Sequence, residues 1–155
     1  TDLESAYIAG FLDGDGCIMF QLVCRKDYVL GYQVRASIVF YQKTIHRKHL
    51  EWLKEKFQVG YVRNRSDGMS EYTIVGIPQV RKVLLQLQTH LRLKRSHAKL
   101  ALKIIDVLPK RFTPERLIAI GKLVDRFREL NYSKRRKNTS ETLRIFFQNA
   151  NQVSP

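Results

Sequence analysis

The sequence predicts an α+β fold in which helices cover one face of an antiparallel sheet and leave the other face open. Three observations predict this class. The spacing of apolar residues changes from helical to alternating and back, in the order helix, two strands, helix, two strands and further helices. Consecutive strands are joined by short turns, as antiparallel strands are. One side of the first strand pair is apolar and the other is mixed and polar, so only one face requires a cover of helices.

The length of 155 residues fits one domain with its own core, and a hydrophobic content of 44% supports a packed core. We therefore expect a single domain over residues 1–155, including the C-terminal helices and the basic loop that follow about residue 110. No run of about 18 apolar residues occurs, and no amphipathic terminal anchor is present, so no membrane partner is expected.

The first helix is expected to have one face that is nearly bare of side chains. It extends from about Leu3 to Leu12, and small residues recur every four positions at Ala6, Gly10 and Gly14. A glycine in a helix interior costs roughly 1 kcal/mol relative to alanine. The spacing therefore indicates close contact with a second helix, which offsets this cost.

Two carboxylates, Asp13 and Asp15, follow at the C-terminal end of this helix, where the helix dipole disfavours negative charge. A bound cation would remove this conflict. Alternatively, DGDG is an ordinary turn that stops the helix, because glycine supplies positive φ and aspartate bonds its own backbone. An EF-hand loop is excluded, since the twelfth position counted from Asp13 is Cys24 rather than glutamate.

A hairpin is expected next, with alternation over residues 18–25, a turn near residues 26–31 and renewed alternation over residues 33–41. Its polar face carries Gln, Arg, Ser and Tyr with few carboxylates. Such a face is either solvated surface or a β-ribbon that reads base edges in a major groove.

The charge of the chain distinguishes these two interpretations. Twenty-eight Lys and Arg residues against fourteen acidic residues give a formal net charge of +14, which favours a polyanionic partner. Nucleic acid is the first candidate and an anionic membrane surface is the second. A zinc site at His46 and His49 is not expected, because Arg47 and Lys48 lie between them and no cysteine or carboxylate cluster is near.

The remaining elements follow from periodicity, caps and turns. A helix is expected over residues 44–57, strands near 59–65 and 70–76, and helices over 78–91, 95–108, 113–130 and from 139 or 140 onward. The turn Ser66-Asp67-Gly68 joins the second pair of strands. The consecutive basic residues 134–137 are either a solvated loop or a set of phosphate contacts.

The segment IAGFLDGDG at residues 8–16 resembles the signature of the LAGLIDADG homing endonucleases. The order of the elements, the length and the segments QKT, GYVR and LKIIDVLP resemble the small homodimeric members of that family over nearly the whole chain. The resemblance implies the αββαββα LAGLIDADG fold, with helices on one face of the sheet and DNA on the other. It also implies a site-specific endonuclease that hydrolyses phosphodiester bonds in both strands of a long pseudo-palindromic DNA target.

The resemblance further implies a homodimer, because cutting two strands requires two reaction centres and this chain has one motif. The signature helices of the two subunits pack together in that family, so the expected interface consists of Ala6, Gly10, Phe11 and Gly14. The implied cofactor is Mg²⁺, with Mn²⁺ or Ca²⁺ able to substitute for binding, and no small-molecule cofactor is implied. Relatives are commonly encoded by introns of organellar genomes, which implies a chloroplast or mitochondrion.

The resemblance also assigns roles to individual residues. Asp15 matches the metal ligand, assisted by the carbonyl of Gly14, whereas Asp13 is a helix-end or structural residue. Gln42 resembles the residue that orients the nucleophilic water, and Lys94 resembles the basic residue that stabilises charge near the scissile phosphate. In the implied mechanism, metals held by the two Asp15 carboxylates activate water and stabilise the leaving oxygen during in-line attack.

DNA contacts are expected from the polar sheet face, from the rim of the site and from the basic segment. These residues are Gln21, Arg25, Gln33, Arg35, Ser37, Tyr41, Arg47, Arg63, Arg65, Glu71, Thr73, Lys134, Arg135 and Lys137. The alternatives are an RNA maturase or a sequence-specific DNA-binding regulator on the same fold, and a basic structural nucleoprotein without sequence preference. Magnesium-dependent strand scission distinguishes the endonuclease from all three.

Overall fold

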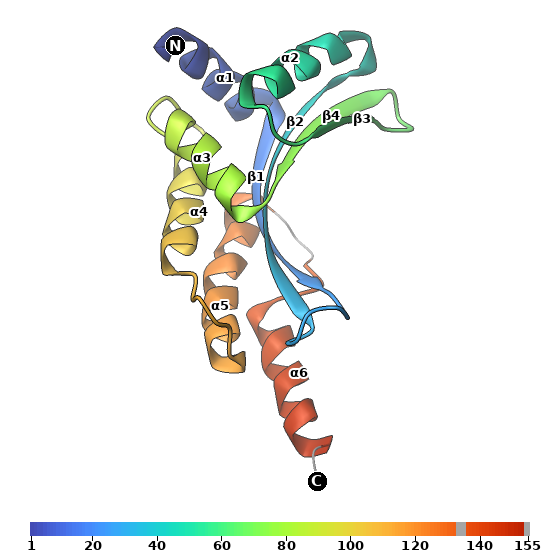
Figure 1. Cartoon of the computed structure of the whole chain (residues 1–155), viewed down its shortest axis with the longest axis vertical. Coiled ribbons are helices and arrows are strands. Elements are labelled where there is room, and N and C mark those ends of the chain that lie inside the picture. Colours follow the sequence, from blue (N-terminus) through green and yellow to red (C-terminus); the bar gives the residue numbers. More distant parts are fainter. Residues whose placement is uncertain (133–135, 154–155) are drawn as a thin grey trace. The chain divides into compact units, whose positions relative to one another are not determined.

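The order of helices and strands confirms the predicted α+β class (Figure 1). A computed structural model describes residues 1–132 and 136–153. The elements are α1 (Asp2–Asp15), β1 (Gly16–Cys24), β2 (Tyr32–Lys43), the 3-10 turn η1 (Thr44–His46), α2 (Arg47–Phe57), β3 (Tyr61–Asn64), β4 (Met69–Val75), α3 (Ile77–Leu87), α4 (Arg95–Val107), α5 (Pro114–Leu130) and α6 (Ser140–Val153). The strands form one sheet in the order β1-β2-β4-β3, in which β4 is antiparallel to both β2 and β3.

The chain divides into two compact units. Unit 1 comprises Thr1–Met19 and Ala36–Leu102, and unit 2 comprises Phe20–Arg35 and Lys103–Pro155. Strands β1 and β2 and helix α4 have residues in both units. The expectation of a single domain over residues 1–155 stays a prediction.

The core of unit 1 lies on one face of the sheet. Phe40 of β2 and Tyr72 of β4 are fully buried, and their rings stack with centroids 5.9 Å apart. Phe11 of α1 stacks on Phe40 at 5.7 Å, and α2 and α3 contact β4. The Tyr72 hydroxyl donates a hydrogen bond to the Val59 carbonyl at 2.7 Å, just after α2. Because side chains alternate along a strand, residues next to Phe40 and Tyr72 belong to the opposite face.

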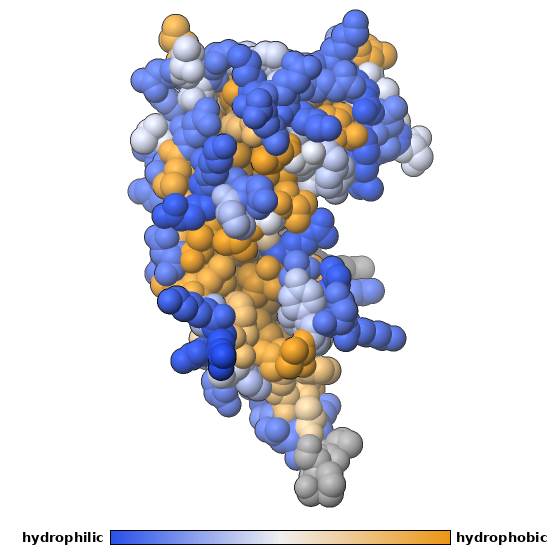
Figure 2. All heavy atoms as spheres, viewed as in Figure 1, coloured by the Kyte–Doolittle hydropathy of each residue, from blue (hydrophilic) through white to orange (hydrophobic). Residues whose placement is uncertain are grey.

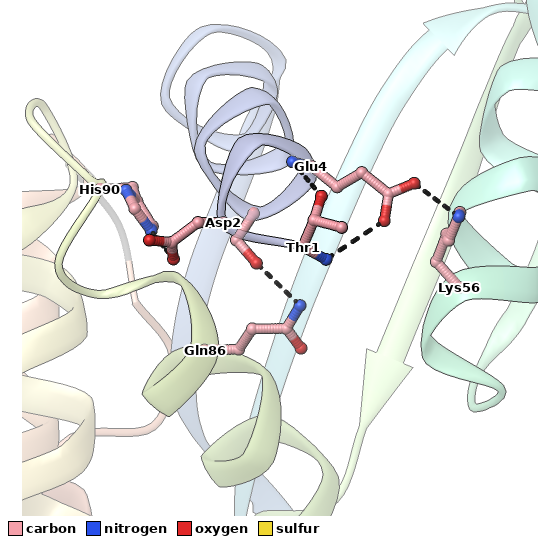
Figure 3. A network of polar contacts seen from close by, with 7 residues as sticks. Thr1, Asp2, Glu4, Lys56, Gln86 and His90 are labelled. Carbon is pink, nitrogen blue, oxygen red and sulfur yellow. Dashed lines mark hydrogen bonds and ion pairs between the residues drawn. The ribbon is translucent and has the colours of Figure 1, made fainter.

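The start of α1 is tied to α2 and α3 by polar contacts (Figure 3). The Thr1 hydroxyl accepts from the Glu4 backbone N–H at 3.2 Å, and the Glu4 carboxylate accepts from the Thr1 ammonium at 3.5 Å, which completes a capping box. The Glu4 carboxylate also accepts a hydrogen bond from Lys56 at 2.6 Å, and this contact lowers the pKa of Glu4. Gln86 of α3 donates to the Ser5 hydroxyl at 3.0 Å.

The end of α1 differs from the prediction. The helix was expected to stop at Leu12, but it continues through Gly14 and ends at Asp15. Gly16 then adopts extended backbone with φ −132° and ψ 178° and begins β1 without an intervening turn. Long-range contacts of Asp13 hold this last turn in the helix, against the local turn preference of DGDG.

The second hairpin confirms the predicted turn at Ser66-Asp67-Gly68. Gly68 has φ +79°, which favours glycine, and the Asp67 carboxylate accepts from the Met69 backbone N–H at 3.2 Å. Strand β3 lies inside its predicted range of 59–65, whereas β4 begins and ends one residue before its predicted range of 70–76. The hairpin sets the register in which Arg63 of β3 faces Glu71 of β4.

Unit 2 has its own core, built from the hairpin end of β1 and β2 and from α5 and α6. Phe20 of β1 packs on Phe127 of α5 with ring centroids 5.7 Å apart. Asp125 of α5 accepts a hydrogen bond from the Ser140 backbone N–H at 3.2 Å, which caps α6. A Cβ on Gly121 would lie 3.0 Å from the Leu143 side chain, so the glycine permits close approach of α5 and α6.

Candidate active site and nucleic-acid interface

The C-terminal end of α1 presents Asp15, the predicted metal ligand. Asp15 and Gly14 are both exposed, and the chain passes directly from Asp15 into β1. The Asp15 carboxylate therefore lies at the junction of helix and sheet, where it is accessible from solvent. The backbone carbonyls of the last helical turn have no partners within α1, because the helix ends there.

Asp13 is engaged in hydrogen bonds to the main chain of a distant segment. One carboxylate oxygen accepts from the backbone N–H of Arg92 at 2.8 Å, and the other accepts from the backbone N–H of Lys94 at 2.9 Å. Both oxygens are occupied by structural bonds. This arrangement agrees with the expected structural role of Asp13 and leaves Asp15 as the accessible carboxylate of the pair.

Lys94 approaches the end of α1 from the segment between α3 and α4. Its Nζ donates a hydrogen bond to the backbone carbonyl of Asp13 at 2.7 Å. A lysine at this position satisfies a carbonyl that the helix leaves unpaired and offsets the negative end of the helix dipole. The structure thus brings the Lys94 ammonium to the same helical turn as Asp15.

Gln42 lies near the end of β2, opposite Ser70 of β4. Its side-chain oxygen accepts from the backbone N–H of Lys43 at 2.9 Å. Because β1 and β2 are neighbouring strands joined by a hairpin, the end of β2 lies at the same end of the sheet as the start of β1, next to Asp15. The role of Gln42 in orienting a water molecule stays a prediction.

The donors at the end of α1 fit a hard divalent cation but do not complete its coordination. Carboxylate and carbonyl oxygens are the ligands that Mg²⁺ and Ca²⁺ prefer. Within residues 1–132 and 136–153, no group of three or more His, Cys, Asp or Glu side chains could hold a metal ion.

The face of the sheet opposite the core carries a row of polar side chains in unit 1. Tyr41, Glu71 and Arg63 lie side by side on β2, β4 and β3. The Arg63 Nε donates to the Glu71 carboxylate, and this hydrogen bond raises the pKa of Arg63. Burial raises the pKa of Tyr41, and the nearby Cys17 and Glu71 reinforce this shift, while Arg65 and Arg63 oppose it.

Three predicted DNA contacts on this face are almost buried in the structure. The exposed fraction is 3% for Ser37, 5% for Thr73 and 8% for Glu71. Thr73 lies between Val39 and Tyr61 in the register, and longer neighbours cover such short side chains. Direct contact of these three residues with bases stays a prediction.

Two other predicted contacts of unit 1 already hold protein partners. Arg65 forms an ion pair with Asp67 at 2.9 Å. Arg47 donates to Glu51 of its own helix at 2.8 Å and to Asn64 of β3 at 2.5 Å, so it ties α2 to the second hairpin. The contact of either arginine with DNA stays a prediction.

The surface over α2, β3 and β4 is mainly hydrophilic (Figure 2). Tyr61, Arg63 and Arg65 are exposed on β3 and just after it. Among the described residues, no helix is both long and apolar enough to cross a membrane. A broad polar surface with exposed guanidinium groups suits a phosphate-rich partner.

Unit 2 carries the other predicted contacts. Gln21, Arg25 and Lys137 are exposed, and Gln33 and Arg35 are half-buried. Arg25 pairs with Asp27 through bonds of 2.9 and 2.8 Å, and this contact raises the pKa of Arg25. Lys134 and Arg135, also predicted contacts, lie outside the described residues.

The predicted interface face of α1 is exposed in unit 1. Ala6, Gly10 and Gly14 all lie on the surface, and among the described residues a Cβ added to either glycine would meet no atom within 4 Å apart from its neighbours and the backbone of α1 itself. Phe11 is half-buried, because its ring stacks on Phe40. The bare stripe inferred from the sequence is therefore open to a partner.

Beside this stripe lies an apolar cleft that the sequence did not indicate. Its volume is about 530 Å³, and it is lined by Leu3, Glu4, Tyr7, His49 and Trp52. The Tyr7 hydroxyl lies 3.2 Å from His49 Nε2, and the His49 ring stacks on Trp52 with centroids 5.4 Å apart. Leu3 is 85% exposed and Tyr7 is 56% exposed. The cleft extends the exposed apolar surface of α1 onto α2.

Comparison with known proteins gives consistent similarities. The model of the LAGLIDADG endonuclease family matches residues 8–95. The DNA endonuclease I-CvuI of Chlorella vulgaris is 41% identical over 142 residues, which are 92% of this chain and 88% of the relative. The DNA endonuclease I-CreI of Chlamydomonas reinhardtii is 40% identical over 139 residues, or 89% of this chain and 85% of the relative.

Two crystal structures of I-CvuI match this chain with a TM-score of 0.91. One, in complex with the I-CreI target in the presence of 2 mM Mg and with the DNA not cleaved, covers 98% of this chain and 97% of that chain at 39% identity. The other, in complex with the target of I-CvuI in the presence of 2 mM Ca, covers 99% of this chain and 98% of that chain at 38% identity.

Proposed function

Because the chain belongs to the LAGLIDADG endonuclease family, we propose that it is a site-specific DNA endonuclease that hydrolyses phosphodiester bonds in both strands of a long pseudo-palindromic target. The observation that carries the proposal is the end of α1, where the exposed Asp15 shares a helical turn with the Lys94 ammonium. In metal-assisted phosphodiester hydrolysis, a carboxylate can hold the metal ion and a fixed cation can stabilise the charge that develops on the phosphate.

Each site residue has one task in this proposal. Asp15, with the Gly14 carbonyl, binds a divalent cation, for which we propose Mg²⁺. When bound, the cation makes a water molecule more acidic and offsets the charge that develops on the scissile phosphate. Lys94 adds a fixed positive charge next to that phosphate, and Gln42 orients the attacking water by a hydrogen bond. The solved complexes of I-CvuI in the presence of Mg and Ca support a divalent cation.

The active assembly in this proposal is a homodimer. One chain carries one signature helix, and two strands must be cut. The exposed stripe of Ala6, Gly10 and Gly14 supports a second copy as the occupant of this face, because the stripe leaves space for a backbone at close range. The adjoining cleft with Tyr7 and Trp52 adds apolar surface of the kind that dimers bury.

The DNA surface in this proposal is the sheet face opposite the core, together with the basic segment near Lys137. Arg63 and Arg65 of unit 1 and Gln21 and Arg25 of unit 2 are exposed and carry the donors that read base edges. We place the enzyme in an organelle, because the two relatives come from Chlorella vulgaris and Chlamydomonas reinhardtii and the resemblance implies intron-encoded members.

The proposal is tested by a cleavage selection on a randomised pseudo-palindromic duplex library with Mg²⁺. The chain and its Asp15→Asn variant are compared, and binding is measured in parallel with Ca²⁺. We expect double-strand cuts within one family of sequences for the unchanged chain. In the variant, cleavage should fall by at least about a thousandfold while binding changes little, because Asn keeps the shape but loses the charge that holds the cation.

A normal cleavage rate in the Asp15→Asn variant would show that Asp15 is not the metal ligand. Selective binding of one sequence family without scission would instead support a DNA-binding regulator. Preference for structured RNA over duplex DNA would support a maturase, and uniform binding of all duplexes would support a structural nucleoprotein.

A further inference from the structure

The Asp13 carboxylate lies at the C-terminal end of α1, where the negative end of the helix dipole would repel it. Hydrogen bonds from another segment offset this repulsion. Its two oxygens accept from the backbone N–H groups of Arg92 and Lys94 at 2.8 and 2.9 Å. Lys94 is the residue just before α4, and its carbonyl accepts from the Ala98 N–H at 3.0 Å, so its N–H belongs to the unpaired amides at the start of α4. The positive end of α4 thus offsets the negative end of α1.

A third hydrogen bond runs in the opposite direction between the same two segments. The Lys94 Nζ donates to the Asp13 backbone carbonyl at 2.7 Å. Asp13 therefore binds the main chain of Lys94, and Lys94 binds the main chain of Asp13, across 81 residues of sequence. Both the backbone and the side chain of Lys94 are fixed by one residue of the signature helix.

The two aspartates of the signature point in different directions. Positions two apart on a helix are separated by about 200° around its axis. Asp13 is half-buried and faces the segment before α4, whereas Asp15 is exposed. The Asp13 carboxylate is held by these two amides and is directed at the segment that carries Lys94, so its contact with the site is through Lys94.

We propose that Asp13 is a positioning residue that holds the Lys94 ammonium beside Asp15 before DNA binds. The expected effect on cleavage rests on the proposed endonuclease function. The positioning of Lys94 itself rests on the three hydrogen bonds described above. Because Lys94 is already in place, the protein loses no side-chain freedom there when DNA binds. We therefore expect Asp13 to increase the rate of the chemical step and to have little effect on the affinity for DNA.

The first test is a double-mutant cycle with single-turnover cleavage of the selected target. Asp13→Ala should reduce the cleavage rate by about 100-fold, since a misplaced catalytic group has effects of that size. Asp13→Asn, which keeps one acceptor oxygen, should recover part of that loss. In a Lys94→Ala background, Asp13→Ala should reduce the rate by less than about threefold, because the two residues act as one unit. Binding of the target with Ca²⁺ should change by less than about threefold in every variant.

Asp2→Ala is the matched control. Asp2 is an aspartate of the same helix, it contacts His90 of the same segment at 3.5 Å, and its side chain is 97% exposed (Figure 3). A loss of activity caused only by loosening the segment would appear in both variants. A cleavage rate that is lower in Asp13→Ala but unchanged in Asp2→Ala supports the positioning role. Independent, multiplicative effects of Asp13→Ala and Lys94→Ala would overturn it.

The second test does not depend on cleavage. Amide hydrogen exchange of the DNA-free protein should be about tenfold or more faster at Arg92 and Lys94 in Asp13→Ala than in the unchanged chain, and unaffected by Asp2→Ala. If the exchange rates of the Arg92 and Lys94 amides were the same in Asp13→Ala as in the unchanged chain, Asp13 would not hold this segment. If the unchanged chain cleaves no DNA, the proposed function fails, and the exchange result still decides whether Asp13 holds Lys94.

Discussion

Glu71 is a carboxylate on a surface that is proposed to face DNA phosphates. It is 8% exposed, and it accepts a hydrogen bond from the Nε of Arg63 on the neighbouring strand. The bond to Nε leaves the two terminal nitrogens of the guanidinium free to form a bidentate contact with a guanine. Glu71 thus restricts the direction of Arg63 and lowers its attraction to any phosphate nearby.

Glu71→Gln tests this role at the scale of one residue. The amide keeps the size of the side chain but loses its charge, so Arg63 becomes free to bind phosphates. We expect discrimination at one base pair to fall by about 1 kcal/mol or more, while affinity for non-target duplex rises slightly. Competition binding on single-base variants of the target measures both quantities.

The control for a simple change of net charge is Glu55→Gln, because Glu55 is an exposed carboxylate on α2. An equal gain of affinity on all duplexes in both variants would mean that Glu71 contributes only charge.

At the scale of elements, α1 has two different faces. Ile8, Ala9 and Leu12 are buried against unit 1, whereas Ala6 and Gly10 face outward. The glycines therefore do not serve packing within the chain. In the proposed homodimer, the approach of a second helix to this face would offset their cost in helix propensity.

Gly10→Leu should separate folding from association. A Cβ at Gly10 would meet no described atom within 4 Å apart from its neighbours and the backbone of its own helix, and leucine favours a helix over glycine by up to about 1 kcal/mol. The chain should stay folded. The dimer should weaken by roughly 2 to 6 kcal/mol, because overpacking costs about 1 to 3 kcal/mol and the position occurs twice.

Sedimentation equilibrium measures the dimer, and urea unfolding of dilute protein measures the fold. Lys82→Leu on the exposed side of α3 is the control for an added surface leucine. A stable Gly10→Leu dimer would place the interface elsewhere.

Local sequence patterns predicted the elements but not their long-range partners. Strands and helices were predicted to within a few residues, because their patterns depend on residues close together in the chain. Examples are the alternation in β2 and the apolar stripe of α3, which consists of Val80, Val83, Leu84 and Leu87. The end of α1 at Asp15 was missed, because it depends on Arg92 and Lys94, about 80 residues away.

The candidate site was predicted as a set of residue types rather than as contacts. The resemblance supplied Asp15 and Lys94, but the pairing of Arg63 with Glu71 requires the register of β3 against β4. The cleft formed by Tyr7, His49 and Trp52 combines α1 with α2, and no spacing within either helix indicates it. The ion pairs of Arg65 with Asp67 and of Arg25 with Asp27 join residues two apart, so for these pairs the sequence does carry a local signal.

At the scale of the whole molecule, a net charge of +14 acts on every duplex alike. Ion pairs such as Arg25 with Asp27 and Arg65 with Asp67 place a carboxylate beside arginines that are proposed to read bases. The carboxylate partly neutralises each of these arginines. The charge that attracts phosphates is then expected on other residues, such as the exposed Lys137. We therefore expect phosphate attraction and base reading to come from different residues.

Lys137→Gln and Arg65→Ala should therefore differ in kind. Removing one phosphate contact lowers the slope of log K against log salt by about 0.9, with equal loss on all sequences. Arg65→Ala should instead reduce preference at one base pair by about 1 to 3 kcal/mol. Binding titrations from low to high salt, on target and scrambled duplexes, distinguish the two results. A uniform loss from both variants would contradict the assignment of Arg65 to base reading.

The single bare face of α1 has a consequence for how such a protein can change over generations. In an assembly of two identical chains, one codon specifies two positions related by symmetry. If Arg63 reads bases in the proposed homodimer, a substitution there would alter the reading of both halves of the target at once, and the protein would not follow a target that changes in one half only. In such a homodimer, changes of specificity would come in symmetric pairs for as long as one gene encodes both subunits.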